Sequence, residues 1–358
     1  MNRCCSPVSC FVPPHVVDRL AESDNATYRR VAHRTAQAAA AAREHRLMFQ
    51  NMPGMASVPS ATAGRERRVH DMQGAEHPLP GTLARGENGA ATGDAAVDEA
   101  FDSAGVTYEF YRTELNRNSL DGRGMMMISS VHYGEEIANA FWNGEQMLYG
   151  DGDGQLFQRF TASLDVVAHE LTHGVVQFTA NLEYLLEPGA LNEHFADVFG
   201  VLVRFSKLGQ DPADPKNWWL GGDVFKPGSG VGGIRTFTAD KAYENHPVLG
   251  TDPQPKHYSK KYMGPRDGGG VHINSGIPNH AFYLTVKALG NSGLKKAALI
   301  WYDTLKSLTQ FSEFQEAAER TVQFAGVRFG TGSLEQRAVA GAWENVGIDA
   351  QLGSFAPV

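Results

Sequence analysis

Hydrophobic and polar positions change their spacing along the chain, and this change divides the chain into two halves. After Thr161 the apolar residues recur with the period of an amphipathic helix. One helical face carries Leu164, Val167, Ala168, Leu171, Val175 and Phe178. The same spacing predicts further helices over residues 190–208, 275–289, 294–307, 312–325 and 333–345. The second half is therefore predicted to be mainly helical.

Before residue 160 the apolar runs are shorter and are interrupted more often. Glycine and aspartate separate runs such as residues 125–133 and 146–149, a pattern that is typical of strands. Residues 95–113 are the exception and are predicted as a helix. The predicted fold class is α+β, with a β-rich domain joined by a central helix to a helical domain. The cleft between two such domains is a common place for an active site.

The first 64 residues differ from both halves. Residues 25–50 are rich in Ala and Arg and have high helix propensity, whereas residues 52–64 have the Pro, Gly, Ser and Ala content of an exposed linker. We therefore expect three units, which are an N-terminal segment with a linker (1–64), a β-rich domain (65–160) and a helical domain (161–358).

Composition narrows the class of protein. The chain has 358 residues, 42% of them hydrophobic, and a net charge of −8, which is typical of a globular protein and argues against nucleic acid as a partner. Its three cysteines are Cys4, Cys5 and Cys10, so disulfides cannot hold the remainder together. No apolar run is long enough to span a membrane, and we expect a monomer. The N-terminus lacks a basic-then-apolar secretory signal, which leaves cytoplasmic storage or non-classical export open.

The sequence HELTH at residues 169–173 carries the strongest chemical signal. Two histidines four residues apart lie on one helix face and can bind one metal ion. Glu170 stands beside the first histidine, where a carboxylate can act as a base. Glu193 lies 193 − 173 = 20 residues further on and can supply a third ligand. His169, His173 and Glu193 with one open position describe a catalytic zinc site. A chance histidine pair on a surface helix is the alternative for HELTH alone.

These motifs, HELTH and the later GALNEHFAD, resemble the thermolysin family of zinc endopeptidases, and the resemblance extends over residues 68–347. It implies that zinc is the cofactor, that Glu170 is the catalytic base and that peptides are the substrates. It also implies that Tyr184 and His272 stabilise the oxyanion, with Asp267 orienting the histidine. An acceptor for the spare N–H of a ligating histidine fixes its tautomer, and we assign Asp197 as this acceptor for His169 and Asn192 for His173.

Substrate-binding residues follow from the same resemblance. Residues 139–144 (NAFWNG) resemble the edge strand that pairs with substrate backbone, with Asn139 and Ala140 as the contacts, and Arg235 matches the arginine that binds the carbonyl just past the cut. The family's specificity pocket maps onto Phe157, Phe160, Val166, Leu220, Val224 and Ile234. Because all six are apolar, we expect cleavage before bulky hydrophobic residues.

At single positions a purely structural role is the alternative to the role that the resemblance implies. Asp197 is otherwise a solvated carboxylate, Tyr184 a packed aromatic and His272 a core histidine. The histidines without ligand-like spacing are predicted to be structural; they are His132, His194, His246 and His257. At the level of function, a zinc aminopeptidase shares HExxH but needs an acidic clamp for a free N-terminus, and no such segment is present. A catalytically silent inhibitory protein on the same fold usually lacks a ligand or the base.

The N-terminal segment resembles the short propeptides of the protealysin-like subgroup. The matching residues are 11–14 (FVPP), followed by a helix, although His15 stands where that subgroup commonly has an apolar or aromatic residue. The resemblance implies that the segment covers the cleft as an intramolecular inhibitor and that the enzyme removes it within residues 51–68. It also implies secretion. A disordered tail is the alternative, and capping of the zinc by cysteine thiolates is a weaker one.

Calcium is the point at which the chain departs from thermolysin. Asp165 retains one acid of the paired calcium site, but the other positions hold Arg204, Asn217, Trp219 and Gly222, and a further site loses its carboxylate at Gly232. Because calcium requires several oxygen ligands, we expect little or no bound calcium. We predict that Arg204 pairs with Asp165 in place of the ions.

Overall fold

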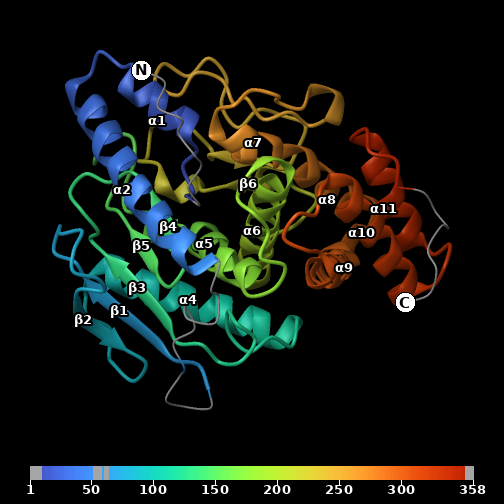
Figure 1. The fold of residues 1–358 in the computed structure, drawn as a ribbon, viewed down its shortest axis with the longest axis horizontal. Helices are drawn as coiled ribbons and strands as arrows, with labels where there is room; N and C mark the ends of the chain where they lie inside the picture. Colours follow the sequence, from blue (N-terminus) through green and yellow to red (C-terminus); the bar gives the residue numbers. More distant parts are fainter. Residues whose placement is uncertain (1–9, 51–58, 60–63, 351–358) are drawn as a thin grey trace.

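The computed structural model describes residues 10–50, 59 and 64–350. A sheet with one long helix forms one side of the molecule, and a set of helices forms the other (Figure 1). Two N-terminal helices, α1 (Pro14–Ala21) and α2 (Ala26–Gln50), lie over the junction between these sides. None of the described helices is long and apolar enough to cross a membrane.

A five-stranded sheet dominates the first side. Its strands are β1 (Arg67–Asp71), β2 (Thr82–Gly86), β3 (Met127–Val131), β4 (Ala140–Trp142) and β5 (Met147–Tyr149). They lie in the order β2-β1-β3-β5-β4, so β4 is an edge strand with one side free to pair with another chain segment. Both β1–β3 and β3–β5 are parallel, whereas β1–β2 and β4–β5 are antiparallel. The long helix α4 (Ala95–Glu114) begins at Asp94, whose side chain accepts hydrogen bonds from two N–H groups of the first turn.

The second side is helical, as the periodicity predicts. Its helices are α5 (Leu164–Gln177), α6 (Leu186–Leu208), α7 (Asp267–Asn274), α8 (Gly276–Leu289), α9 (Gly293–Ser307), α10 (Phe314–Phe329) and α11 (Leu334–Asn345). Short strands β6 (Trp219–Leu220) and β7 (Arg235–Thr236) pair antiparallel. The 3₁₀ turns are η1 (Phe160–Ala162), η2 (Pro215–Trp218), η3 (Gly222–Val224), η4 (Tyr258–Lys260) and η5 (Gly290–Ser292).

Helix α5 is the central element of the fold. Every residue from Asp165 to Gln177 is buried, because the helix packs against both sides of the molecule. Helix α6 crosses it closely at Gly200, where a Cβ would stand 2.8 Å from the carbonyl oxygen of Asp165 and 3.3 Å from the Cβ of His169. A side chain at this position would push the two helices apart, so glycine allows α6 to bring its carboxylates close to α5.

One helix boundary and one additional helix depart from the prediction for a physical reason. Helix α6 begins at Leu186 rather than at residue 190, because Pro188 lies in the first helical turn, where the missing N–H has no partner to lose. Helix α7 was not predicted, and its three glycines, 268–270, have φ values of 57°, 84° and 86°. A segment with this backbone has no helical periodicity in its sequence.

Candidate metal centre and active site

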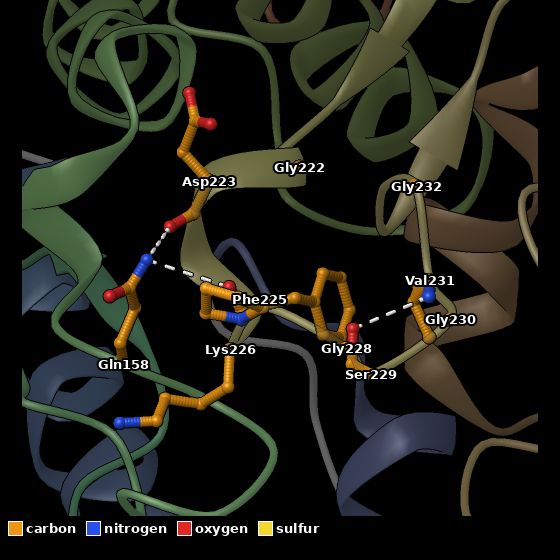
Figure 2. Close-up of a pocket in the computed structure, with 11 residues that line it drawn as sticks. Gln158, Gly222, Asp223, Phe225, Lys226, Gly228, Ser229, Gly230, Val231 and Gly232 are labelled. Atoms are coloured by element: carbon orange, nitrogen blue, oxygen red, sulfur yellow. Dashed lines mark hydrogen bonds between the residues drawn. The ribbon is translucent and has the colours of Figure 1, made fainter.

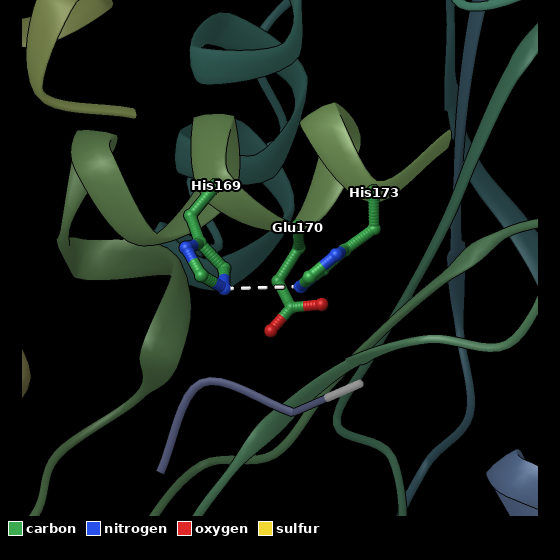
Figure 3. A group of neighbouring side chains, drawn as sticks. All are labelled: His169, Glu170 and His173. Atoms are coloured by element: carbon green, nitrogen blue, oxygen red, sulfur yellow. Dashed lines mark hydrogen bonds between the residues drawn. The ribbon is translucent and has the colours of Figure 1, made fainter. Parts of the chain in front are cut away.

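His169 and His173 project from the same face of α5. Their Nε2 atoms are 3.1 Å apart, and both side chains are completely buried. Figure 3 shows the two imidazoles and Glu170 directed toward the N-terminal segment, which is drawn in blue below them. Burial lowers the pKa of His173 to about 4 despite the opposing effect of Glu193. The imidazole is therefore neutral near pH 7, which is the state that binds metal.

Glu193 reaches the same point from α6. Its Oε1 lies 3.3 Å from Nε2 of His173 and its Oε2 lies 3.7 Å from Nε2 of His169. Oε2 is buried and receives no hydrogen bond from the part of the chain that the structure describes. Burial would raise the pKa of Glu193, but the imidazoles of His272 and His173 outweigh it and hold this pKa well below its usual value. Two imidazole nitrogens and an ionised carboxylate thus converge on one point, and one carboxylate oxygen there accepts no hydrogen bond from the described residues. This set of groups fits a zinc ion.

The outer nitrogens of both histidines face acceptors. Nδ1 of His173 donates to Oδ1 of Asn192 at 2.8 Å, and Nδ1 of His169 lies 2.8 Å from Oδ1 of Asp197. A proton on Nδ1 leaves the Nε2 lone pair free for a metal. Asp197 is also bound by Arg235, with a shortest distance of 2.9 Å, and by the side-chain amide of Asn279 at 2.8 Å. The sequence analysis missed Asn279, because nothing in its local sequence connects it to the motif.

Glu170 lies between the metal ligands and the edge strand. Its Oε2 accepts a hydrogen bond of 2.9 Å from the backbone N–H of Trp142 in β4, and its Oε1 has no partner among the described residues. Burial, followed by the negative charge of Glu193, raises the pKa of Glu170 well above its usual value. A carboxyl group with a raised pKa is suited to accept a proton and to release it again.

Three glycines place His272 opposite the metal ligands. Their positive φ values turn the chain so that Asp267 accepts from Nδ1 of His272 at 2.6 Å and from its backbone N–H at 2.9 Å. Burial would lower the pKa of His272, but Glu193 and Asp267 outweigh it and raise this pKa well above its usual value. The imidazole is therefore a charged donor. The Tyr184 hydroxyl lies 3.1 Å from its Nε2 and donates to Glu193.

The N-terminal segment lies in this cleft. Phe11 is fully buried, with its ring centre 5.3 Å from that of His169 and 4.5 Å from the guanidinium carbon of Arg235. Arg235 also donates to the Phe11 carbonyl at 2.7 Å. On the other side of the cleft, Arg46 of α2 is buried over the Tyr184 ring, 4.9 Å from its centre. The segment therefore covers the site from both directions.

The six residues assigned to the specificity pocket are all buried in one cluster that also contains Phe11. A Cβ on Gly221 would stand 2.4 Å from the Phe11 ring and 3.6 Å from Val166, so the ring is seated against this wall. A separate cavity of about 470 Å³ lies beyond the pocket, between Gln158 and the loop 222–232 (Figure 2). Among the described residues that line it, Asp223 and Lys226 are the charged ones, and none of them belongs to the site.

Arg204 pairs with Asp165, as predicted. Its Nη1 donates to Oδ2 of Asp165 and, at 2.6 Å, to the carbonyl of Trp219. Asp165 also accepts from Ser163 at 2.6 Å and from the backbone of Gly221 at 3.2 Å. The carboxylate oxygens are thus held by protein donors on the positions that calcium ligation would use.

The four histidines that were predicted to be structural lie outside the cluster. His194 connects Asn279 to the indole of Trp301, and His246 and His257 accept backbone N–H groups in turns. His132 lies between the carboxylates of Asp151 and Asp94, at 2.8 and 3.1 Å. All four have structural contacts, in agreement with the prediction.

Comparison with known proteins identifies the family. The model of the thermolysin metallopeptidase catalytic domain matches residues 60–177, and that of the thermolysin metallopeptidase alpha-helical domain matches residues 180–348. The extracellular metalloprotease of Pectobacterium carotovorum subsp. carotovorum is 40% identical over 346 residues, which cover 96% of this chain and 97% of the relative. Protease PrtS of Photorhabdus sp. (strain Az29) is 46% identical over 287 residues, 79% of this chain and 76% of that protein.

A solved structure extends the similarity to the N-terminal segment. The precursor of protealysin, a metalloproteinase from Serratia proteamaculans, is 40% identical, superposes with a TM-score of 0.85, and the match covers 95% of this chain and 100% of that one. Thermolysin of Alicyclobacillus acidocaldarius subsp. acidocaldarius is 40% identical over 285 residues, 75% of this chain but 49% of its own length. The family models, the relatives and the fold agree, and this chain belongs to the thermolysin family of metallopeptidases and is a metalloendopeptidase.

Proposed function

We propose that this chain is a zinc endopeptidase that cleaves on the amino side of bulky hydrophobic residues and is made as a precursor inhibited by its own N-terminal segment. The observation that carries the proposal is the position of Phe11. Its buried side chain is seated against Gly221, next to Val166 of the proposed pocket, while Arg235 donates to its carbonyl oxygen at 2.7 Å. A substrate residue directly after the cut would occupy the same place.

His169, His173 and Glu193 would hold the zinc ion, which when bound supplies a Lewis acid that polarises the scissile carbonyl and acidifies water. Glu170 accepts a proton from the attacking water and passes it to the leaving nitrogen. The charged imidazole of His272 donates to the developing oxyanion, and Tyr184 assists. Each such donor is worth about 2–4 kcal/mol of transition-state stabilisation.

Backbone contacts orient the substrate along β4. The carbonyl of Ala140 and the side-chain amide of Asn139 face the cleft and accept N–H groups of the N-terminal segment at 3.3 and 2.8 Å. The six apolar side chains of the pocket contain no charge, so burial of a Leu or Phe side chain contributes about 1.5–3 kcal/mol. Asp, Lys and Gly gain nothing comparable there.

The inhibitory role is supported by the burial of residues 10–12 in the cleft and by the protealysin precursor as a structural relative. Removal within residues 51–68 remains a proposal; most of that range lies outside the described residues. One relative is an extracellular metalloprotease, which favours secretion of this chain as well. We further propose a monomer that acts without nucleic acid or membrane.

One assay tests the proposed function. A library of peptides blocked at both ends is given to the zinc-loaded protein before and after loss of its N-terminal segment, as followed by intact mass. We expect cleavage before Leu and Phe that rises as the segment is lost. Full activity with an intact N-terminus contradicts the inhibitory role. Cleavage mainly before Asp, Lys or Gly contradicts the pocket, and products from unblocked peptides alone indicate an aminopeptidase.

A further inference from the structure

The N-terminal segment crosses the cleft in one defined register. Cys10 pairs antiparallel with Phe141 of β4, and the N–H of Phe11 donates to the carbonyl of Ala140 at 3.3 Å. The N–H of Val12 donates to Oδ1 of Asn139 at 2.8 Å, and Nδ2 of Asn139 donates back to the Val12 carbonyl at 3.1 Å. A shift of one residue would remove the phenylalanine from its pocket.

This register places one peptide bond at the catalytic groups. Nε2 of His272 donates to the carbonyl of Cys10 at 2.9 Å, and Arg235 donates to the next carbonyl, that of Phe11, at 2.7 Å. The proposed oxyanion donor therefore holds the carbonyl on one side of the Cys10–Phe11 bond, while the side chain on the other side of the bond is seated against Gly221, next to Val166 of the proposed specificity pocket. We infer that the Cys10–Phe11 bond is itself a cleavage site, which each molecule cuts in its own cleft as the first processing step.

The inference rests on the proposed endopeptidase function and requires no further reactant. The oxygen of one water molecule bonds to the carbonyl carbon of Cys10, and the bond from this carbon to the nitrogen of Phe11 breaks. Glu170 accepts a proton from the water and delivers it to that nitrogen. The second proton of the water follows to the same nitrogen, so the products are a carboxylate at Cys10 and an ammonium group at Phe11. Residues 1–10 leave, whereas residues 11–50 stay attached to the rest of the chain.

Occupation of the cleft also determines the order of cuts. While residues 10–12 are seated, a bond within residues 51–68 of the same molecule cannot enter the cleft. A cut there must come from a second molecule or follow departure of the segment. The cut at Cys10–Phe11 is intramolecular, so its rate constant is independent of protein concentration. It removes the bridge to β4 and the hydrogen bond to His272, and thereby weakens the hold of the segment.

The experiment follows the full-length zinc-loaded precursor over a wide range of concentrations by intact mass and N-terminal sequencing. We expect a new N-terminus at Phe11 that forms with a concentration-independent rate constant before any N-terminus within residues 51–68. The Glu170→Gln precursor should form none. A Phe11 terminus that forms faster at higher concentration, or only after the linker is cut, overturns the intramolecular step.

Matched variants separate the register from the thiol. Phe11→Leu and Cys10→Ser should keep the cut, because an apolar side chain and the Cys10 carbonyl are what the site uses. Phe11→Asp should slow it by roughly tenfold or more.

A synthetic peptide of residues 6–18 tests the same bond in a separate molecule. The processed enzyme should cut this peptide between Cys10 and Phe11, whether or not the N-terminal segment of the Phe11→Asp precursor binds in the cleft. The inference is overturned if the enzyme cuts blocked peptides before Phe but cuts neither its own chain nor the 6–18 peptide between Cys10 and Phe11. That result would leave the proposed function intact. Loss of all blocked-peptide cleavage means that the proposed function has failed.

Discussion

The two buried carboxylates Glu193 and Glu170 suit opposite tasks because their surroundings differ. Glu193 faces imidazoles that keep it ionised, whereas Glu170 faces Glu193 and a single backbone N–H. The first therefore suits a metal ligand and the second a group that takes and releases a proton. Their separate environments explain why two buried carboxylates so close together are not interchangeable.

Replacement of Glu170 tests this division at the residue scale. Glu170→Gln keeps the shape of the side chain but cannot accept a proton, so we expect kcat to fall by about 10²–10⁴-fold or more while zinc content stays at that of the wild type. Metal analysis and peptide hydrolysis are measured on the same sample. Glu183→Gln, which removes a carboxylate outside the cluster, serves as the control. Near wild-type turnover in the zinc-loaded Glu170 variant would refute its role as base.

At the scale of elements, the pair Arg204 and Asp165 joins α6 to the start of α5. Asp165 is fully buried and accepts hydrogen bonds from Ser163, Arg204 and the backbone of Gly221. An arginine in this position compensates the carboxylate charge as a calcium ion would. The proposed zinc ligands His169 and His173 follow Asp165 by one and two turns of α5, so this pair lies at the start of the helix that carries them.

The absence of a calcium requirement follows as a prediction. A calcium-selective chelator should leave the melting temperature unchanged while zinc remains bound. Arg204→Met should lower stability by about 3–5 kcal/mol, because it leaves a buried carboxylate uncompensated. The double variant Asp165→Asn with Arg204→Met should recover part of the loss. A large drop in melting temperature on calcium removal would show that the substitutions were misinterpreted.

At the scale of the whole molecule, the N-terminal segment packs against both sides of the cleft. Helix α2 contacts the first side through Arg30, which binds Glu136 at 2.6 Å, while His15 of α1 lies 2.8 Å from the hydroxyl of Tyr243 on the second side. Figure 1 shows both helices over the junction. The segment therefore bridges the two sides as well as filling the cleft.

This interface should weaken in acid. Burial lowers the pKa of His15 to about 4. The positive charges of His272 and Arg235 act in the same direction, whereas the carboxylates of Asp267 and Asp252 oppose this shift. Protons therefore bind the released segment, with a pKa near 6.5, better than the seated one. The contribution of His15 to docking is full above pH 6.5 and is lost as the pH falls toward 4. On the inactive Glu170→Gln precursor, the melting temperature should fall more between pH 7 and 5 than it does with His15→Gln added. Equal slopes would contradict this coupling.

Much of the fold was predictable because local rules decide it. The apolar period of 3.6 predicted α5 and α8–α11 within a few residues, and the runs 125–133 and 146–149 between glycine and aspartate turns predicted β3 and β5. The metal ligands were predictable for a related reason. Positions 169 and 173 must share a helix face whatever the rest of the chain does.

What the sequence by itself determined is the set of groups: two histidines on one helix face, a glutamate beside them, and a resemblance that assigned the other roles by position. Tertiary structure decided which groups meet. Asp197 contacts His169, Arg235 and Asn279, which belong to three separate elements. The position of Phe11 in the cleft depends on residues more than 200 positions away in the sequence, such as Arg235. Periodicity describes one element at a time, whereas these contacts arise only when helices and edge strand pack around a common cleft.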